Sequence, residues 1–281
     1  MYKIGLSTCG REVTEEMCQG YKNAGIEVME VSYGSELLKR IDLRETKRLA
    51  DKYGINLWSF HLPFDPYDTC EISRRENQEV VVANLTELIK RAASIGIDKY
   101  VIHPSGEAIR ENREERMKCA KDSLARLAEF AKAEGGILAV EDLPRMCLGN
   151  TPESMLELLG AHEDLRVCLD TNHMLNRDVC KLIRTMGDKI VTLHVSDYDY
   201  QNERHWLPGE GDIPWQDVLY ALKEVSYTGP WLYELGLSCP DSIIRPRDFS
   251  YEDIANNARE IFAGKKPTTI CTRIEGLGMW P

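Results

Sequence analysis

Residues Ile137–Asp170 read ILAVEDLPRMCLGNTPESMLELLGAHEDLRVCLD and contain one complete strand–helix–strand repeat. Both ends of this stretch, ILAVED and RVCLD, are short apolar runs that finish in carboxylates. Such runs are typical of strands buried on both faces of a parallel sheet. Between them, Thr151 and Pro152 form a good N-cap and first-turn pair for a helix through ESMLELL. The stretch therefore predicts a βαβ unit.

The same alternation extends over the chain in both directions. Eight strands are expected, at Lys3–Ser7, Glu27–Tyr33, Asn56–Leu62, Tyr100–Pro104, Ile137–Asp142, Arg166–Asp170, Ile190–Val195 and Trp231–Leu235. Helices are expected to begin near Asp42, Ser73, Asn112, Thr151, Pro214 and Ser250. Eight right-handed βα units close naturally into a barrel of about 250 residues. We therefore predict an α/β fold, a single-domain (β/α)8 TIM barrel over residues 1–264, followed by a tail at 265–281 without periodicity.

Composition narrows the class of protein. The chain has 281 residues and a net charge of −11, which argues against a nucleic-acid surface. No apolar run approaches the roughly 20 residues of a membrane span, and the N-terminus does not resemble a signal peptide. The nine cysteines form no C-x-x-C pair, and free thiols at this density suit a reducing cytoplasm, where we expect the protein. An open doubly wound sheet is less favoured because the turn after Ser7 lacks the dinucleotide-binding glycines.

In a TIM barrel, functional groups come from the carboxyl ends of the strands and the loops that follow them. Six consecutive strands end here in a metal-ligand or acid–base residue: His61, His103, Glu141, Asp170, His194 and Glu234. His173 and His205 lie in loops at the same rim, so only His162 among the six histidines stands outside the pattern. Each residue alone is compatible with an ordinary capping or hydrogen-bonding role. Together they favour a functional site, because a buried carboxylate must be paired or coordinated.

The segments AVEDLP, CLDTNH, LHVSDYDYQNERHWLPGEGDIPW and LYELG resemble the xylose isomerase-like barrel superfamily of sugar isomerases and epimerases. The resemblance runs from about residue 4 to residue 264, and its most specific part is H-x-x-D followed by R-H-x-x-P-G-x-G-x-I. It implies that one ion is held by Glu141, Asp170, His194 and Glu234. It further implies that substrate is bound by His173, by Arg204 through a substrate oxygen, and by His205, and we add His61 and His103 to this substrate-binding set.

The implied ligand set is chemically coherent. Three carboxylates and one imidazole suit one hard divalent cation, with Mn²⁺ preferred and Mg²⁺, Co²⁺ or Zn²⁺ as alternatives. Such an ion polarises a substrate carbonyl and stabilises the enediolate that forms when a neighbouring proton leaves. Glu141 and Glu234 are the candidate catalytic residues, which would remove a proton at one face and return it at the other. Asp197 is expected to orient a neighbouring ligand. The expected function is thus a metal-dependent sugar, keto-sugar or polyol isomerase or epimerase.

Two other activities stay open. Keto-sugar dehydratases and lyases share the first step, abstraction of an α-proton. Endonuclease IV-like apurinic-site DNA endonucleases of the same superfamily bind three zinc ions, and candidates for the extra ligands are His61, His103, His173, Glu203 and His205. Glu203 stands where that family usually places Asp, and the acidic charge balance disfavours DNA. The expected partner is a small, unphosphorylated sugar, with no nucleic acid and no membrane; a homo-oligomer is left open.

Overall fold

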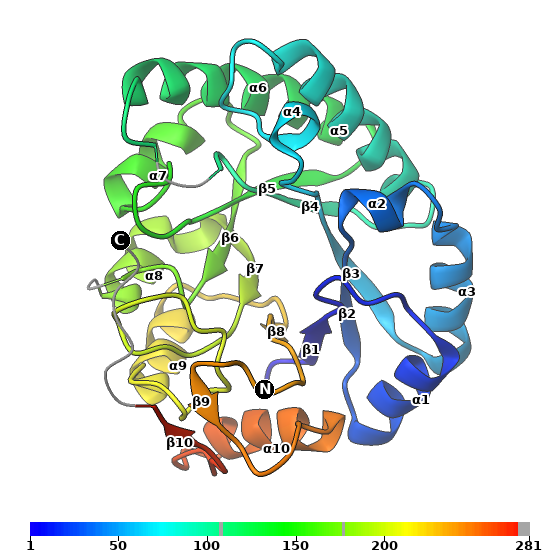
Figure 1. Ribbon diagram of the computed structural model, residues 1–281, viewed down its shortest axis with the longest axis vertical. Coiled ribbons are helices and arrows are strands. Elements are labelled where there is room, and N and C mark those ends of the chain that lie inside the picture. The colour runs from blue at the N-terminus through cyan, green and yellow to red at the C-terminus, as the bar shows by residue number, and fades with distance from the viewer. Residues whose placement is uncertain (107–108, 176–177, 275–281) are drawn as a thin grey trace.

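The computed structural model describes residues 1–106, 109–175 and 178–274, and its centre is a ring of parallel strands surrounded by helices (Figure 1). The eight strands pair in the order β7-β6-β5-β4-β3-β2-β1-β8. Their bounds are β1 Ile4–Ser7, β2 Val28–Ser32, β3 Asn56–His61, β4 Lys99–Ile102, β5 Ile137–Glu141, β6 Arg166–Asp170, β7 Ile190–His194 and β8 Trp231–Tyr233. All eight expected strands are present, and none of their ends is displaced by more than two residues.

The sheet closes on itself between its first and last strands in the pairing order. Just after β7, the amide of Val195 donates to the carbonyl of Leu232 at 2.8 Å, and the amide of Glu234 donates to the carbonyl of Val195 at 3.2 Å. On its other side β8 pairs in parallel with β1. These contacts confirm the predicted TIM barrel and exclude an open doubly wound sheet.

The helices lie on the outside of the barrel (Figure 1). Their bounds are α1 Glu15–Ala24, α2 Ser35–Leu38, α3 Leu43–Tyr53, α4 Tyr67–Cys70, α5 Gln78–Ala93, α6 Arg113–Ala133, α7 Pro152–Leu159, α8 Val179–Met186, α9 Trp215–Glu224 and α10 Tyr251–Phe262, with a 3-10 turn at Gly187–Lys189. Three of the expected caps accept backbone amides, at Asp42, Thr151 and Ser250. Such caps accept hydrogen bonds from backbone amides that have no partner within the helix. A cap and its helix are neighbours in the chain, so the local sequence was sufficient to predict these helix starts.

One expected helix start was wrong. The helix predicted from Ser73 begins instead at Gln78, after a turn. The hydroxyl of Ser73 donates to the buried carboxylate of Glu71 and accepts from Arg116 at 2.7 Å. A tertiary contact therefore occupies the side chain that local sequence favoured as a cap.

The interior of the barrel explains which side chains reach the site. Val101, Ala139 and Cys168 form a small apolar cluster, separate from the main core that lies between the sheet and the helices. Side chains two residues apart on a strand share a face. Glu141 and Asp170 follow Ala139 and Cys168 by two residues, so both carboxylates point into the barrel at its carboxyl end.

The described part of the tail lies beside the segment that follows β8. β10 (Thr272–Arg273) pairs antiparallel with β9 (Ile243–Ile244). Arg273 donates through Nε to the carbonyl of Glu210 at 2.6 Å and pairs with Asp212 at 2.8 Å. None of the nine cysteines forms a disulfide. Within the ranges given above, no helix has both the length and the apolar character needed to cross a membrane.

Candidate metal centre and active site

Four side chains meet at the carboxyl ends of β5 to β8, and we call them the strand cluster: Glu141, Asp170, His194 and Glu234. Their ligand atoms all lie within 4.8 Å of one another. Nδ1 of His194 is 3.1 Å from a carboxylate oxygen of Glu141, 3.4 Å from Glu234 and 4.0 Å from Asp170. Glu234 is the most solvent-exposed of the four, with 15% of its side chain exposed. The structure thus brings together the four residues that the sequence proposed as ligands.

The strand cluster has the donor set and the electrostatic demand of a cation site. Oδ1 of Asp170 accepts the amide of Asn172 at 2.6 Å, whereas its Oδ2 is buried without a hydrogen-bond partner. A buried carboxylate oxygen without a partner is costly unless a cation or donor compensates it. Three carboxylates and one imidazole at this spacing can hold a divalent ion.

The two candidate acid–base residues differ in electrostatic environment. Burial opposes ionisation of Glu141, but the facing rings of His194 and His103 hold its pKa well below the usual range. For Glu234, burial raises the pKa, and the charges of Glu141 and Asp170 add to that effect. One carboxylate is therefore firmly anionic, while the other holds a proton more readily.

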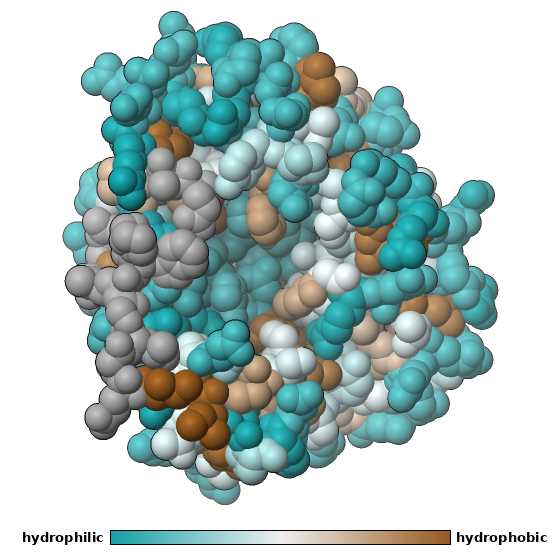
Figure 2. All heavy atoms as spheres, in the orientation of Figure 1, coloured by the Kyte–Doolittle hydropathy of each residue, from teal (hydrophilic) through white to brown (hydrophobic). Residues whose placement is uncertain are grey.

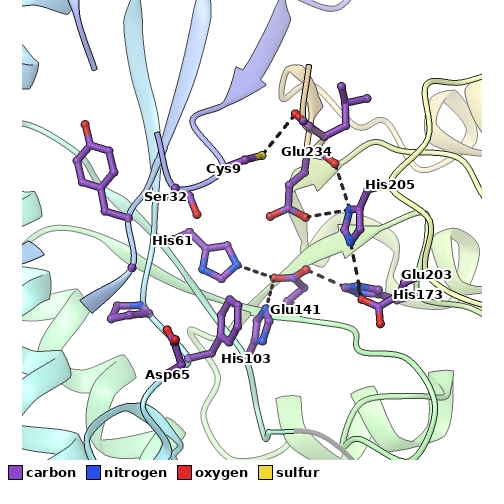
Figure 3. Close-up of a pocket in the computed structure, with 17 residues that line it drawn as sticks. Cys9, Ser32, His61, Asp65, His103, Glu141, His173, Glu203, His205 and Glu234 are labelled. Carbon is purple, nitrogen blue, oxygen red and sulfur yellow. Dashed lines mark hydrogen bonds and ion pairs between the residues drawn. The ribbon is translucent and has the colours of Figure 1, made fainter. Parts of the chain in front are cut away.

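Two histidines from β3 and the end of β4 contact the second oxygen of Glu141 (Figure 3). Nε2 of His61 and Nε2 of His103 lie 3.1 and 3.2 Å from Oε2 of Glu141. Burial lowers the pKa of His61, but the hydrogen bond and charge of Glu141 outweigh it and raise the value to about 9. Phe64 stacks on His103 with ring centroids 4.4 Å apart, which makes a flat wall beside Glu141.

A second group of ligand-type residues lies on loops, and we call it the loop cluster: His173, Glu203 and His205. Oε1 of Glu203 is 3.1 Å from Nε2 of His173 and 3.7 Å from Nε2 of His205. The other ring nitrogens donate to backbone carbonyls, His173 to Asp142 at 2.7 Å and His205 to Glu234 at 3.2 Å. This group lies next to the strand cluster (Figure 3): Nδ1 of His173 is 3.6 Å from Oε1 of Glu141, and Nδ1 of His205 is 4.0 Å from Oε2 of Glu234.

The loop that carries Glu203 and His205 is held by buried polar side chains. Oδ1 of Asn172 accepts the amides of Arg204 and His205 at 3.0 and 3.4 Å. Asn172 is the second residue after β6, within the CLDTNH segment. It therefore connects the rim of the barrel to the loop cluster.

Asp197 also holds this loop, contrary to the expectation that it orients a ligand. Its carboxylate accepts four N–H groups, the amides of Tyr198, Gly209 and Ile213 and the indole of Trp215, at 2.7 to 3.2 Å. The loop passes so close that a side chain at position 211 would meet an Asp197 oxygen at 2.1 Å, which explains the glycine there.

The loop cluster, together with Glu141 and Glu234 of the strand cluster, lines one cavity of about 530 Å³ at this end of the barrel. Figure 2 shows the same face hollowed near its centre, with hydrophilic side chains at the floor. The lining comprises Cys9, Gly10, Ser32, Tyr33, Gly34, His61, Pro63, Phe64, Asp65, His103, Glu141, His173, Glu203, His205, Glu234, Leu235 and Gly236. The four histidines expected to bind substrate are thus all at its wall.

Arg204 is placed differently. Its guanidinium pairs with Asp199 at 2.8 to 2.9 Å, and Arg204 is not among the described residues that line the cavity. Its contact with a substrate oxygen stays a prediction.

Glu30, which the sequence analysis missed, lies beneath the site with its side chain against His194. A carboxylate in the middle of the apolar strand VMEVS was the signal for it.

Residues 19–259 match the model of the xylose isomerase-like TIM barrel family. The chain belongs to this family. It is 26% identical over 224 residues to a D-psicose 3-epimerase from Ruminiclostridium cellulolyticum, covering 75% of this chain and 74% of that protein. It is 25% identical over 167 residues to a probable endonuclease 4 from Acholeplasma laidlawii, covering 52% and 56%. A solved L-ribulose 3-epimerase shares the fold with a TM-score of 0.76, at 23% identity and 94% coverage of both chains.

Proposed function

We propose that this protein is a divalent-metal-dependent epimerase or isomerase of a sugar, keto-sugar or polyol. The observation that carries the proposal is the convergence of Glu141, Asp170, His194 and Glu234. Two of them, Glu141 and Glu234, line the cavity, and the buried Oδ2 of Asp170 has no hydrogen-bond partner. The relationship to a D-psicose 3-epimerase supports the same class of substrate. No described Lys or Arg lines the cavity, which favours an uncharged ligand over a sugar phosphate.

The strand cluster would hold the cation, with Mn²⁺ the first choice on the chemistry of its ligands and Mg²⁺, Co²⁺ or Zn²⁺ as alternatives. When bound, the ion supplies Lewis-acid polarisation of a substrate carbonyl. Glu141 and Glu234 both lie against Nδ1 of His194, at 3.1 and 3.4 Å, and are the pair that would exchange protons with the substrate carbon. Glu234 is the more exposed of the two, so its carboxylate is the more accessible from the cavity.

The remaining polar wall would bind and orient the sugar. His61 and His103 present imidazole rings beside Glu141, and Phe64 stacked on His103 offers an apolar face to carbon-bound hydrogens. His173 and His205 face the same space from the loop. Closely placed hydroxyl-binding groups of this kind fix which carbon lies next to the proton-exchanging carboxylates.

The test combines metal analysis with isotope exchange. The purified protein is depleted with a chelator, reloaded with Mn²⁺ and incubated with a panel of ketohexoses and ketopentoses in deuterated water. We expect about one ion per chain, and a new stereoisomer or aldose carrying deuterium at the exchanged carbon. Loss of water from the sugar would identify a dehydratase or lyase instead. A protein that binds no divalent ion would contradict the proposal.

One further observation favours a second candidate, a three-zinc apurinic-site endonuclease. His61, His103 and Glu141 form a second potential ligand group, and the loop cluster forms a third. The net charge of −11 opposes it, because DNA binding depends on basic surface. Three zinc ions per chain together with cleavage of a duplex containing an abasic site would establish this alternative. One ion and no cleavage would exclude it.

A further inference from the structure

Glu30 is a fully buried carboxylate inside the barrel, and the function proposed above assigns it no role. It lies on β2, where it is paired in register with Ser7 of β1 and Ser59 of β3. No described group of side chains close enough to share an ion includes Glu30. A charge at this depth needs a compensating partner.

That partner is the imidazole of His194. Nε2 of His194 lies 3.0 Å from Oε1 and 3.1 Å from Oε2 of Glu30, and the hydroxyl of Ser59 donates to Oε2 at 2.7 Å. The opposite nitrogen of the same ring, Nδ1, faces the strand cluster. The ring therefore stands between a carboxylate below it and the candidate ion site above it.

We propose that Glu30 is a positioning residue that keeps the proton of His194 on Nε2 and directs the lone pair of Nδ1 toward the strand cluster. An imidazole that donates one N–H to a carboxylate has a fixed tautomer, a fixed ring plane and a more basic second nitrogen. The hydroxyl of Ser59 in turn fixes the carboxylate of Glu30. Residues of β2 and β3 therefore orient His194, and through it they act on the candidate ion site. The inference rests on the metal site proposed above.

The principal experiment measures metal affinity in Glu30→Gln, which keeps the shape of the side chain and removes its charge. Competition with a chromophoric chelator gives the Kd for Co²⁺, and the visible absorption spectrum of bound Co²⁺ reports its coordination. We expect the Kd to rise about 10- to 100-fold, with an altered spectrum. A Kd within twofold of the wild type with an unchanged spectrum would overturn the proposal. Failure of the wild type to bind Co²⁺ would instead count against the proposed function.

The matched control is Glu71→Gln. Glu71 is also a buried glutamate, with 3% exposure, but its carboxylate binds Arg74 and Arg116 outside the site. This variant should lose stability without a change in the Kd for Co²⁺. An equal loss of affinity in both variants would show that general destabilisation is responsible, and would overturn the specific role of Glu30.

A second measurement needs no variant. In wild-type protein loaded with Zn²⁺ and labelled with ¹⁵N-histidine, two-dimensional imidazole spectra identify which nitrogen carries the proton. We expect His194 to carry it on Nε2, with Nδ1 as the metal-bound nitrogen. The opposite tautomer would overturn the proposal, whether or not Glu30→Gln folds.

Discussion

The strand cluster and the loop cluster contain similar residue types but are positioned by different means. Glu141, Asp170 and His194 are the last residues of β5, β6 and β7, and each is less than 2% exposed. In the loop cluster, His173 is also buried, but 38% of the His205 side chain and 22% of the Glu203 side chain are exposed. The register of a closed barrel determines the first group, whereas hydrogen bonds from side chains determine the second.

This difference indicates which of the two clusters would carry out the reaction and which could vary between related proteins. Groups on rigid strands would hold an ion in one geometry, and electrostatic preorganisation of this kind is the largest contribution in many active sites. Groups on a loop can change between relatives without disturbing the barrel. We therefore expect the reaction type to depend on the strand cluster, and the choice of substrate to depend on the loop cluster.

The largest expected effect comes from removing a carboxylate that we propose exchanges protons with the substrate. Glu234→Gln and Glu141→Gln should each lower turnover by about 10²- to 10⁴-fold, because a general acid–base contributes roughly that factor. We expect metal analysis to find an ion still bound in both variants. The measurement is deuterium incorporation into the sugar that the wild type converts.

Glu203→Gln is the matched comparison from the loop cluster. We expect it to alter KM more than kcat, with a total loss below about tenfold. A loss as large as that of Glu234→Gln would remove the distinction between the clusters and would favour the three-zinc alternative.

A smaller effect is expected when the loop loses its main anchor. Asp197→Ala leaves four N–H donors without their acceptor, so the free energy of unfolding should fall by about 2–4 kcal/mol. Urea denaturation measures this change. Asp212→Ala, at an exposed aspartate of the same loop, should change it by less than about 0.5 kcal/mol. Co²⁺ affinity at the strand cluster should stay within about threefold of wild type in both variants; a larger loss would mean that the loop shapes the strand cluster.

The smallest effect concerns pH. Burial opposes ionisation of Asp199, but the Arg204 guanidinium and the amides of Gln201 and Asn202 hold its pKa below the usual value. A lowered pKa means that the stabilisation is complete above the unfolded-state value of about 3.9 and is lost as pH falls through the folded-state value. Asp199→Asn should therefore be less stable than wild type by about 1 kcal/mol at pH 7.

That stability difference should shrink as the pH falls from 5 toward 3. Unfolding free energies of both proteins across this range test the sign. A difference that stays constant with pH would show that the charge of Asp199 does not stabilise the loop.

Most of the architecture was predictable because its signals are local. Alternating apolar strands and capped helices placed all eight strands, and Asp42, Thr151 and Ser250 cap their helices as expected. The error at Ser73 has a physical cause, since its hydroxyl binds Glu71 and Arg116 instead of capping a helix. A local pattern does not contain the position of an arginine 43 residues away.

The sequence by itself determined the barrel, the rim at which the site lies and the residue types available for a cation. The carboxyl ends of parallel strands all lie at one rim, so the carboxylates and histidines at these ends must lie there too. Only the tertiary structure decided which atoms meet. It placed Glu30 beneath His194, turned Arg204 toward Asp199 and assigned Asp197 to the loop. These outcomes depend on side-chain direction and on hydrogen bonds between residues distant in the chain, which strand and helix periodicity does not specify.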